Sequence, residues 1–257
     1  MHVPIPQLDA LRARIAQIER RGAVRTGVPL RFGVPVIDRH IPGGGLAPGA
    51  LHEVTGDGPD LEHATAATLL VAGLLARRRG PVLWALEQRD LFAPGLAAAG
   101  LHPDRVVFAE AGRTVLLAME EALHHAGLAA VVGEVRRLGL TASRRLQLAA
   151  EGSGVPAFAL RRSHSASDPA LTEPNAAATR WRVAAMPSPP VLEHAPDVPG
   201  LARALWRLEL LRCRGGVPAT WIVEACDAKG RLALVADTGD RQAASPPQHT
   251  AGWRAAG

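Results

Sequence analysis

The sequence predicts an α/β protein with a mostly parallel sheet, covered by helices on both faces and extended by a C-terminal antiparallel meander. Two observations support this fold class. Short apolar segments alternate with helix-like segments from residue 50 to residue 160, a pattern typical of β-α-β units in a parallel sheet. Three strand-like segments then follow one another from residue 206 to residue 236, joined by glycine-containing turns, which is typical of an antiparallel meander.

The alternating region starts with a predicted strand at 50–55 and a predicted helix at 61–79. This helix should end at Arg77-Arg78-Arg79-Gly80-Pro81, because cations suit the last turn of a helix and glycine and proline stop it. The elements that follow are strand 82–86, a short helix near 91–99, strand 105–109, helix 113–126, strand 128–133, helix 141–151 and strand 155–160.

The pattern changes near residue 163, where a loop rich in Ser, Ala, Pro and Asn runs to Thr179. A strand at 180–183 and a proline-rich connection at 186–200 come next. The meander is predicted as strands 206–212, 219–225 and 231–236.

The two ends of the chain differ from its centre. Apolar residues at helical spacing predict an amphipathic helix at 7–21, and the last 20 residues are typical of a disordered tail. We therefore expect an N-terminal arm at 1–27, a core at 28–236 and a tail at 237–257.

The composition of the 257 residues, 47% of them hydrophobic, allows a full core to be buried. The formal charge of +5 arises almost entirely from arginine on the basic side. The sequence has neither a signal-peptide pattern nor an apolar run of about 18 residues, so we expect a cytoplasmic protein without a membrane partner. Cys213 and Cys226 lack metal-ligand spacing, and no metal site is expected.

The connection between strand 50–55 and helix 61–79 has the position and length of a phosphate-binding P-loop without its chemistry. A P-loop requires glycines, a lysine that reaches the phosphates and a Ser or Thr that holds magnesium. The chain has one lysine, Lys229, and Glu62 or His63 falls at the P-loop lysine position. Three carboxylates near the helix start would also repel a polyphosphate. We therefore expect no nucleotide cofactor and no catalytic residue. We call this segment the degenerate loop, and its residues are Gly56, Asp57, Gly58, Asp60, Glu62 and His63.

The degenerate loop has two interpretations. We favour a vestige in which Asp57 or Asp60 caps the following helix by accepting hydrogen bonds from its free N–H groups. The alternative is a loop recruited for a protein contact.

The segment from Arg31 to Gly56, RFGVPVIDRHIPGGGLAPGALHEVTG, resembles the segment that leads into the P-loop of RecA-type recombinases. Glu87 matches the position of the water-activating glutamate of that family, and Gly133-Glu134 occupies the Walker B position with its aspartate displaced. The resemblance implies a RecA-like, P-loop NTPase-type core. Without a triphosphate held by lysine, Glu87 and Glu134 are expected to be solvated or salt-bridged carboxylates.

Among RecA relatives without the P-loop lysine, the chain is similar to the ImuA family. The motifs that carry this similarity are WALE at 84–87, RDLFAPG at 89–95, VGEVRRL at 132–138, TRWR at 179–182 and WRLELLRCRGG at 206–216. The family implies a non-catalytic accessory role in error-prone translesion synthesis and SOS mutagenesis. The implied partners are an ImuB-like Y-family polymerase relative, an error-prone C-family polymerase and RecA, with self-association as a further option. Three alternatives remain open: a SulA-like cell-division inhibitor, a RecA-like DNA-binding ATPase with a non-standard nucleotide site, and a free-standing DNA-binding module.

Eight arginines between residues 131 and 182 are the candidates for a nucleic-acid or partner surface. In RecA this stretch includes the loops that face DNA, and arginine suits phosphate through paired hydrogen bonds. Few aromatic side chains lie nearby for base stacking, so solvated helix-end and helix-face residues are a nearly equal alternative. The candidates are Arg136, Arg137, Arg144, Arg145, Arg161, Arg162, Arg180 and Arg182.

Overall fold

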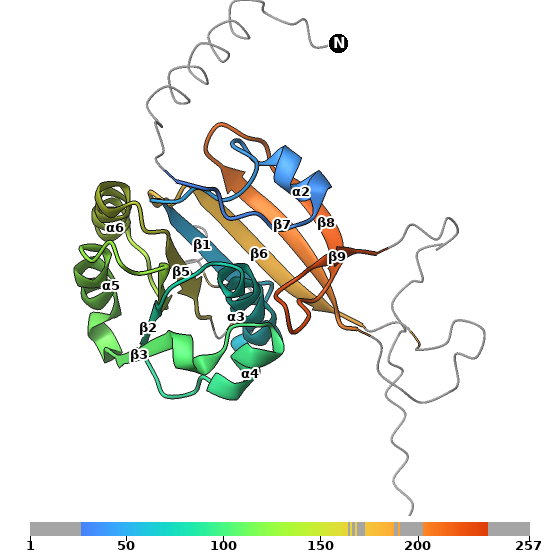
Figure 1. The fold of residues 1–257 in the computed structure, drawn as a ribbon, viewed down its shortest axis with the longest axis horizontal. Coiled ribbons are helices and arrows are strands. Elements are labelled where there is room, and N and C mark those ends of the chain that lie inside the picture. Colours follow the sequence, from blue (N-terminus) through green and yellow to red (C-terminus); the bar gives the residue numbers. More distant parts are fainter. Residues whose placement is uncertain are drawn as a thin grey trace, which may run out of the picture.

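The computed structural model describes residues 27–235 except 164, 166–167, 169–172, 188–189 and 191–202. The helix expected at 7–21 and the tail expected at 237–257 lie outside the described residues. Within the described residues the strands form one nine-stranded sheet in the order β3-β2-β4-β5-β1-β6-β7-β8-β9 (Figure 1).

The helices and strands have the following bounds. The strands are β1 (Leu51–Gly56), β2 (Val82–Leu86), β3 (Val106–Glu110), β4 (Ala130–Val135), β5 (Ala157–Arg161), β6 (Thr179–Met186), β7 (Leu205–Cys213), β8 (Ala219–Glu224) and β9 (Ala233–Leu234). The α-helices are α2 (Pro35–His40), α3 (Asp60–Ala76), α4 (Ala93–Ala98), α5 (Val115–Leu123) and α6 (Leu140–Ser153). Two 3-10 turns, η1 (Pro103–Arg105) and η2 (Gly112–Thr114), complete the set.

Strands β1 to β6 pair in parallel, and β7, β8 and β9 extend the sheet in antiparallel pairing from β6. The predicted fold class is therefore confirmed. We call the side of the sheet where the parallel strands end the carboxyl edge and the side where they begin the amino edge. Helix α3 starts at the carboxyl edge after β1 and returns to the amino edge, where β2 begins.

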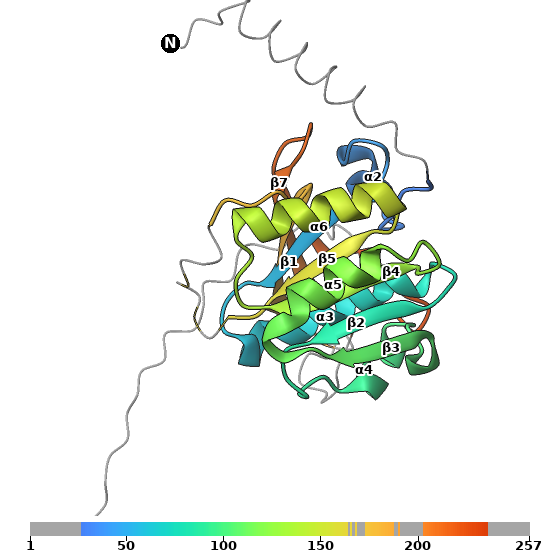
Figure 2. The ribbon, with the colours of Figure 1, turned by 90° about the vertical axis from the view of Figure 1, so that its left-hand side faces the viewer.

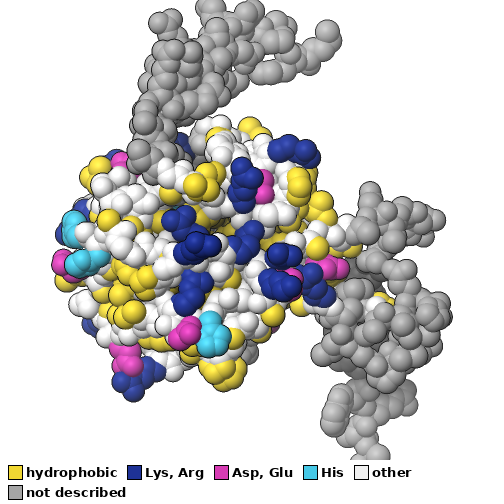
Figure 3. All heavy atoms as spheres, in the orientation of Figure 1, with side chains coloured by type: hydrophobic (Ala, Val, Ile, Leu, Met, Phe, Trp, Pro, Cys, Tyr) yellow, Lys and Arg dark blue, Asp and Glu magenta, His cyan; other side chains and the backbone are white. Residues whose placement is uncertain are grey.

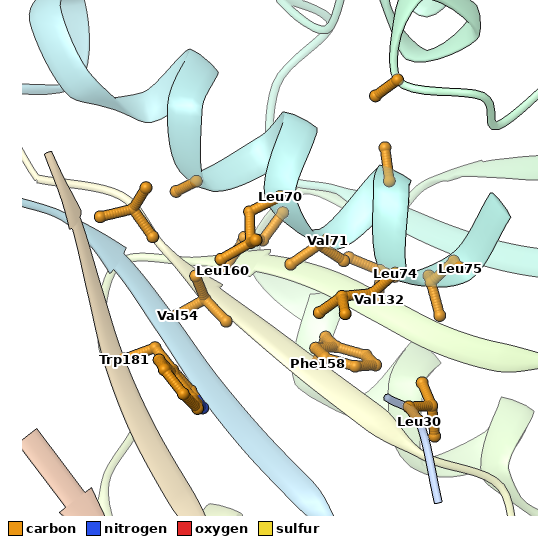
Figure 4. Packing of buried hydrophobic residues seen from close by; sticks show 14 of the residues in the cluster. Leu30, Val54, Leu70, Val71, Leu74, Leu75, Val132, Phe158, Leu160 and Trp181 are labelled. Atoms are coloured by element: carbon orange, nitrogen blue, oxygen red, sulfur yellow. The ribbon is translucent and has the colours of Figure 1, made fainter. Parts of the chain in front are cut away.

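The core lies on both faces of the sheet. On one face, α3 places Leu70, Val71 and Leu75 against Val132 and Phe158 of the parallel strands (Figure 4). On the other face, α5 and α6 pack together over a second cluster of buried side chains that includes Met119 and Leu146. Figure 2 shows α5 and α6 on the side of the sheet opposite α3. Both faces of β1 are buried along its whole length, as expected for a central parallel strand.

Several elements depart from their predicted bounds. Helix α2 was not predicted; its six residues are too few for a helical period to show, and Asp38 fixes its start by accepting the N–H groups of Phe32 (2.7 Å) and Gly33 (3.0 Å). Strand β6 is longer than 180–183 because β7 pairs with it from Thr179 to Met186. Strand β9 is shorter than 231–236 because only Ala233 and Leu234 pair with β8. No helix in the described part of the chain is long and apolar enough to cross a membrane.

Candidate functional site

The degenerate loop is packed closely against the start of α3. Strand β1 ends at Gly56 and α3 begins at Asp60. A Cβ atom on Gly56 would lie 2.8 Å from Cβ of His63, so only glycine fits where the helix meets the strand. The Nδ1 atom of His63 accepts the N–H of Ala185 in β6 at 3.4 Å, which directs this side chain toward β6.

Three backbone N–H groups at the start of α3 form hydrogen bonds within the chain. The N–H of Asp60 donates to the carbonyl of Ser163 (2.8 Å), and the N–H groups of Glu62 and His63 donate to Pro59 (3.0 and 3.2 Å). The prediction that Asp57 or Asp60 caps this helix is wrong, because Pro59 holds the N-cap position and no side chain caps it. The carboxylate of Asp60 instead accepts the N–H of Ser163 at 2.9 Å, which ties α3 to the segment after β5.

Asp57 is neutralised by arginines from two neighbouring strands. Its carboxylate pairs with Arg182 of β6 (3.2 Å) and with Arg207 of β7. Glu209 pairs with the same two arginines. Sequence reasoning missed Arg207 and Glu209. The alternation of charge on β7, read with its antiparallel pairing to β6, would have been the available signal.

A pocket of about 560 Å³ opens at the carboxyl edge beside α3 and α4. Apolar and uncharged polar residues form part of its wall, and six charged side chains also line it. The charged residues are four acids, Asp60, Glu87, Asp90 and Glu134, and two arginines, Arg136 and Arg162. The structure therefore brings the two glutamates of the RecA comparison into one pocket next to the degenerate loop.

Arg162 is the central cation of this pocket. Its guanidinium lies 3.2 Å from Asp60 and 3.7 Å from Glu134, and it also pairs with Asp90. One arginine thus links the start of α3, the end of β4 and the segment after β2. Arg162 was among the candidates for a nucleic-acid or partner surface, and the structure pairs it with three carboxylates.

Glu134 is the buried acid of the pocket, with its side chain only 2% exposed. Burial raises the pKa of its carboxyl group, while Arg162 and a hydrogen bond from Trp84 oppose the shift. The indole N–H of Trp84 donates to Oε1 of Glu134 at 3.1 Å. Glu87, which directly follows the neighbouring strand β2, pairs with Arg136 at 3.5 Å.

Three features of these residues differ from those of a site that binds a nucleoside triphosphate with magnesium. Glu62, one of the two residues that fall at the P-loop lysine position, is an exposed carboxylate beside the other, His63. Three N–H groups in the first turn of α3, those of Asp60, Glu62 and His63, are already bonded to Ser163 and Pro59. The pocket carries more carboxylates than guanidiniums, which disfavours a polyanion. Within the described residues, no group of His, Cys, Asp and Glu could hold a metal ion.

The remaining candidate arginines are spread over different places. Arg161 and Arg180 pair with Glu53 in a buried cluster between β5, β1 and β6, and Asn175 donates to the same carboxylate at 2.8 Å. Burial lowers the pKa of Arg161, and the Glu53 carboxylate opposes that shift.

The other three arginines of the set lie at the surface of the α5 and α6 face. Arg145 of α6 pairs with Glu120 of α5 at 2.8 Å. Arg137 and Arg144 are exposed and form no ion pair with the described residues. Six of the eight candidates are therefore paired with carboxylates, and the set does not form one continuous cationic surface.

The sheet order, the strand-to-helix connection at its carboxyl edge and the antiparallel extension define a RecA-like α/β protein. The crystal structure of the RadB recombinase has the same fold, with a TM-score of 0.54 and 20% sequence identity over 80% of this chain and 99% of that one. No protein-family model matches the chain. The sequence is 42% identical over 215 residues to Protein ImuA of two strains of Caulobacter vibrioides, covering 79% of this chain and 86% of the relative. The chain therefore belongs to the ImuA family.

Proposed function

We propose that this ImuA-family protein is a non-catalytic RecA-like accessory factor of error-prone translesion synthesis in the response to DNA damage. It acts by protein contacts with an ImuB-like relative of Y-family polymerases and an error-prone C-family polymerase, and RecA is a further candidate partner. Family membership at 42% identity supports the cellular role. It favours this role over that of a SulA-like cell-division inhibitor.

The observation that carries the non-catalytic part of the proposal is the state of the degenerate loop. In a working RecA-type site, the helix that corresponds to α3 begins with free N–H groups and a lysine that bind phosphate. Here the N–H of Asp60 is bonded to Ser163, and Arg162 is held by carboxylates from three elements. A cation that could replace the missing lysine is thus committed to Asp60, Asp90 and Glu134. This argues against the ATPase alternative.

The proposal is tested by complementation in the host after deletion of the gene. Deletion should abolish the damage-induced rise in mutation frequency, and the full chain should restore it. A Glu87→Gln variant should restore it equally, because Glu87 activates no water in this account and its pair with Arg136 is partly exposed. After DNA damage, the ImuB-like protein and the C-family polymerase should co-purify with the unmodified chain and with the Glu87→Gln variant.

Two outcomes would overturn the proposal. Normal damage-induced mutagenesis in the deletion strain would remove the cellular role. A folded Glu87→Gln protein that behaves like the deletion would show that catalysis at the pocket is required.

A further inference from the structure

The largest group of arginines without carboxylate partners lies at the amino edge, where α3 ends and the chain enters β2. Figure 3 shows Arg and Lys side chains gathered across the middle of this face. We call this group the amino-edge patch, and its residues are Arg31, Arg77, Arg78, Arg79, Arg105 and Arg231.

Hydrogen bonds bring the members of the patch together. Arg77 donates to the carbonyl of Arg31, and Arg105 donates to the carbonyls of Arg78 and of Ala76 (3.1 Å) and Gly80 (2.9 Å). These bonds satisfy carbonyls around the end of α3, which is the ordinary structural use of cations at a helix C-terminus. They join backbone oxygens and leave the positive charges unneutralised.

Backbone packing places Arg231 in the same neighbourhood, because a Cβ atom on the preceding residue, Gly230, would lie 2.9 Å from Cβ of Ala76 at the end of α3. The pKa of Arg77 is lowered mainly by burial, and the Arg231 charge adds to this, while Asp38 and Asp227 oppose it. These two carboxylates accept backbone N–H groups: Asp38 from the loop before α2, and Asp227 from the turn before β9. Among the described residues, none of the six patch arginines forms an ion pair.

The two edges of the sheet therefore differ in sign. The carboxyl-edge pocket has more acids than arginines, whereas the amino-edge patch has six arginines, and Asp38 and Asp227 are the carboxylates that act on the pKa of Arg77. A polyanion is attracted to the amino edge and repelled from the pocket. Arginine also binds phosphate through two parallel hydrogen bonds, which suits a nucleic-acid backbone.

The side chains of the patch indicate whether it suits single-stranded or duplex nucleic acid. Proteins that bind single strands combine cations with aromatic side chains on which bases stack. The patch is defined by six arginines, which offer phosphate contacts. Phe32, beside Arg31 in the chain, is buried, and the exposed Phe92 lines the carboxyl-edge pocket instead, so neither supplies a stacking surface at the patch. We propose that the amino-edge patch binds the phosphate backbone of duplex DNA without reading its sequence. This site is separate from the candidate arginines at 131–182. The proposal of duplex binding does not depend on the proposed contacts with polymerases.

The test is fluorescence anisotropy of a labelled duplex of about 30 base pairs, titrated with the full-length protein at several salt concentrations. If about four phosphates are contacted, log Kd should change with log salt with a slope of about 4 in magnitude. The double variant Arg79→Gln and Arg231→Gln should reduce this slope by about 2 and weaken binding roughly 10- to 100-fold at low salt. Both side chains are exposed and take no part in the hydrogen bonds that close α3.

The matched control is the double variant Arg137→Gln and Arg144→Gln, which removes the same charge from two exposed arginines on the β4–α6 connection and α6. It should change duplex affinity less than about twofold. Equal losses in the two double variants, or a loss only in the control, would overturn the assignment of the site. Tighter binding to a single strand or to a poly-glutamate competitor than to the duplex would overturn the assignment of the ligand, as would the absence of duplex binding at low salt.

Discussion

Replacing Glu53 with alanine is expected to lower the free energy of unfolding by about 3–5 kcal/mol. The Glu53 side chain is 1% exposed, and its carboxylate pairs with Arg161 at 3.1 Å and with Arg180. Removing it takes away the negative charge that balances two guanidiniums inside the protein, and an unbalanced buried charge is costly. Asn175, in the segment that leads into β6, would lose its bond to the same carboxylate. Urea unfolding followed by tryptophan fluorescence measures the loss.

The matched control is Glu120→Ala, because Glu120 also pairs with an arginine. That pair is more exposed, with Arg145 at 60% and Glu120 at 22%, and its removal should cost no more than about 1 kcal/mol. Similar losses in the two variants would contradict the view that the Glu53 cluster anchors β1, β5 and β6 to the segment before β6.

Introducing an aspartate at Gly133 is expected to destabilise the protein by more than about 3 kcal/mol rather than to create a magnesium site. Gly133 and Glu134 are neighbours on β4, so their side-chain positions face opposite sides of the sheet. Glu134 faces the pocket. A Cβ atom on Gly133 would instead lie 2.2 Å from Sδ of Met119 and 2.9 Å from Val115 in α5. Thermal and urea unfolding of Gly133→Asp measure the effect.

Two further variants separate the causes of that loss. Gly133→Ala adds only the methyl group and should cost about 1–3 kcal/mol through overpacking. Gly152→Ala adds the same group in α6, where nothing lies within 4 Å, and should leave stability unchanged or raise it by up to about 1 kcal/mol. Magnesium-dependent stabilisation of Gly133→Asp would contradict the prediction.

The fold was predictable from the sequence because its signals are local. Apolar strands between helices indicated the parallel part, and the Arg77-Arg78-Arg79-Gly80-Pro81 run placed the end of α3 within about a turn of Ala76. Helix α2 was not predicted because its six residues are too few to show a helical period of apolar side chains, and the Asp38 side chain fixes its start.

The site was predictable in position but less so in its contacts. The carboxyl ends of parallel strands lie at one edge, so a common location for Glu87 and Glu134 followed from the strand assignment. The pairing of Arg162 with Asp60, Asp90 and Glu134 joins residues far apart in the chain, and no periodic pattern encodes it. The amino-edge patch was overlooked for a related reason: the run at 77–79 has an ordinary explanation as a helix stop, and Arg31, Arg105 and Arg231 join it only through the fold.

The most direct test of the account is isothermal titration calorimetry of the full-length, untagged protein with ATP and magnesium. We expect no binding heat up to about millimolar ATP. We expect the same for Glu62→Lys, because the N–H of Asp60 stays bonded to Ser163 and Arg162 stays paired with its three carboxylates. Micromolar binding by the unmodified protein would contradict the central claim and make Glu87 and Glu134 candidates for catalysis.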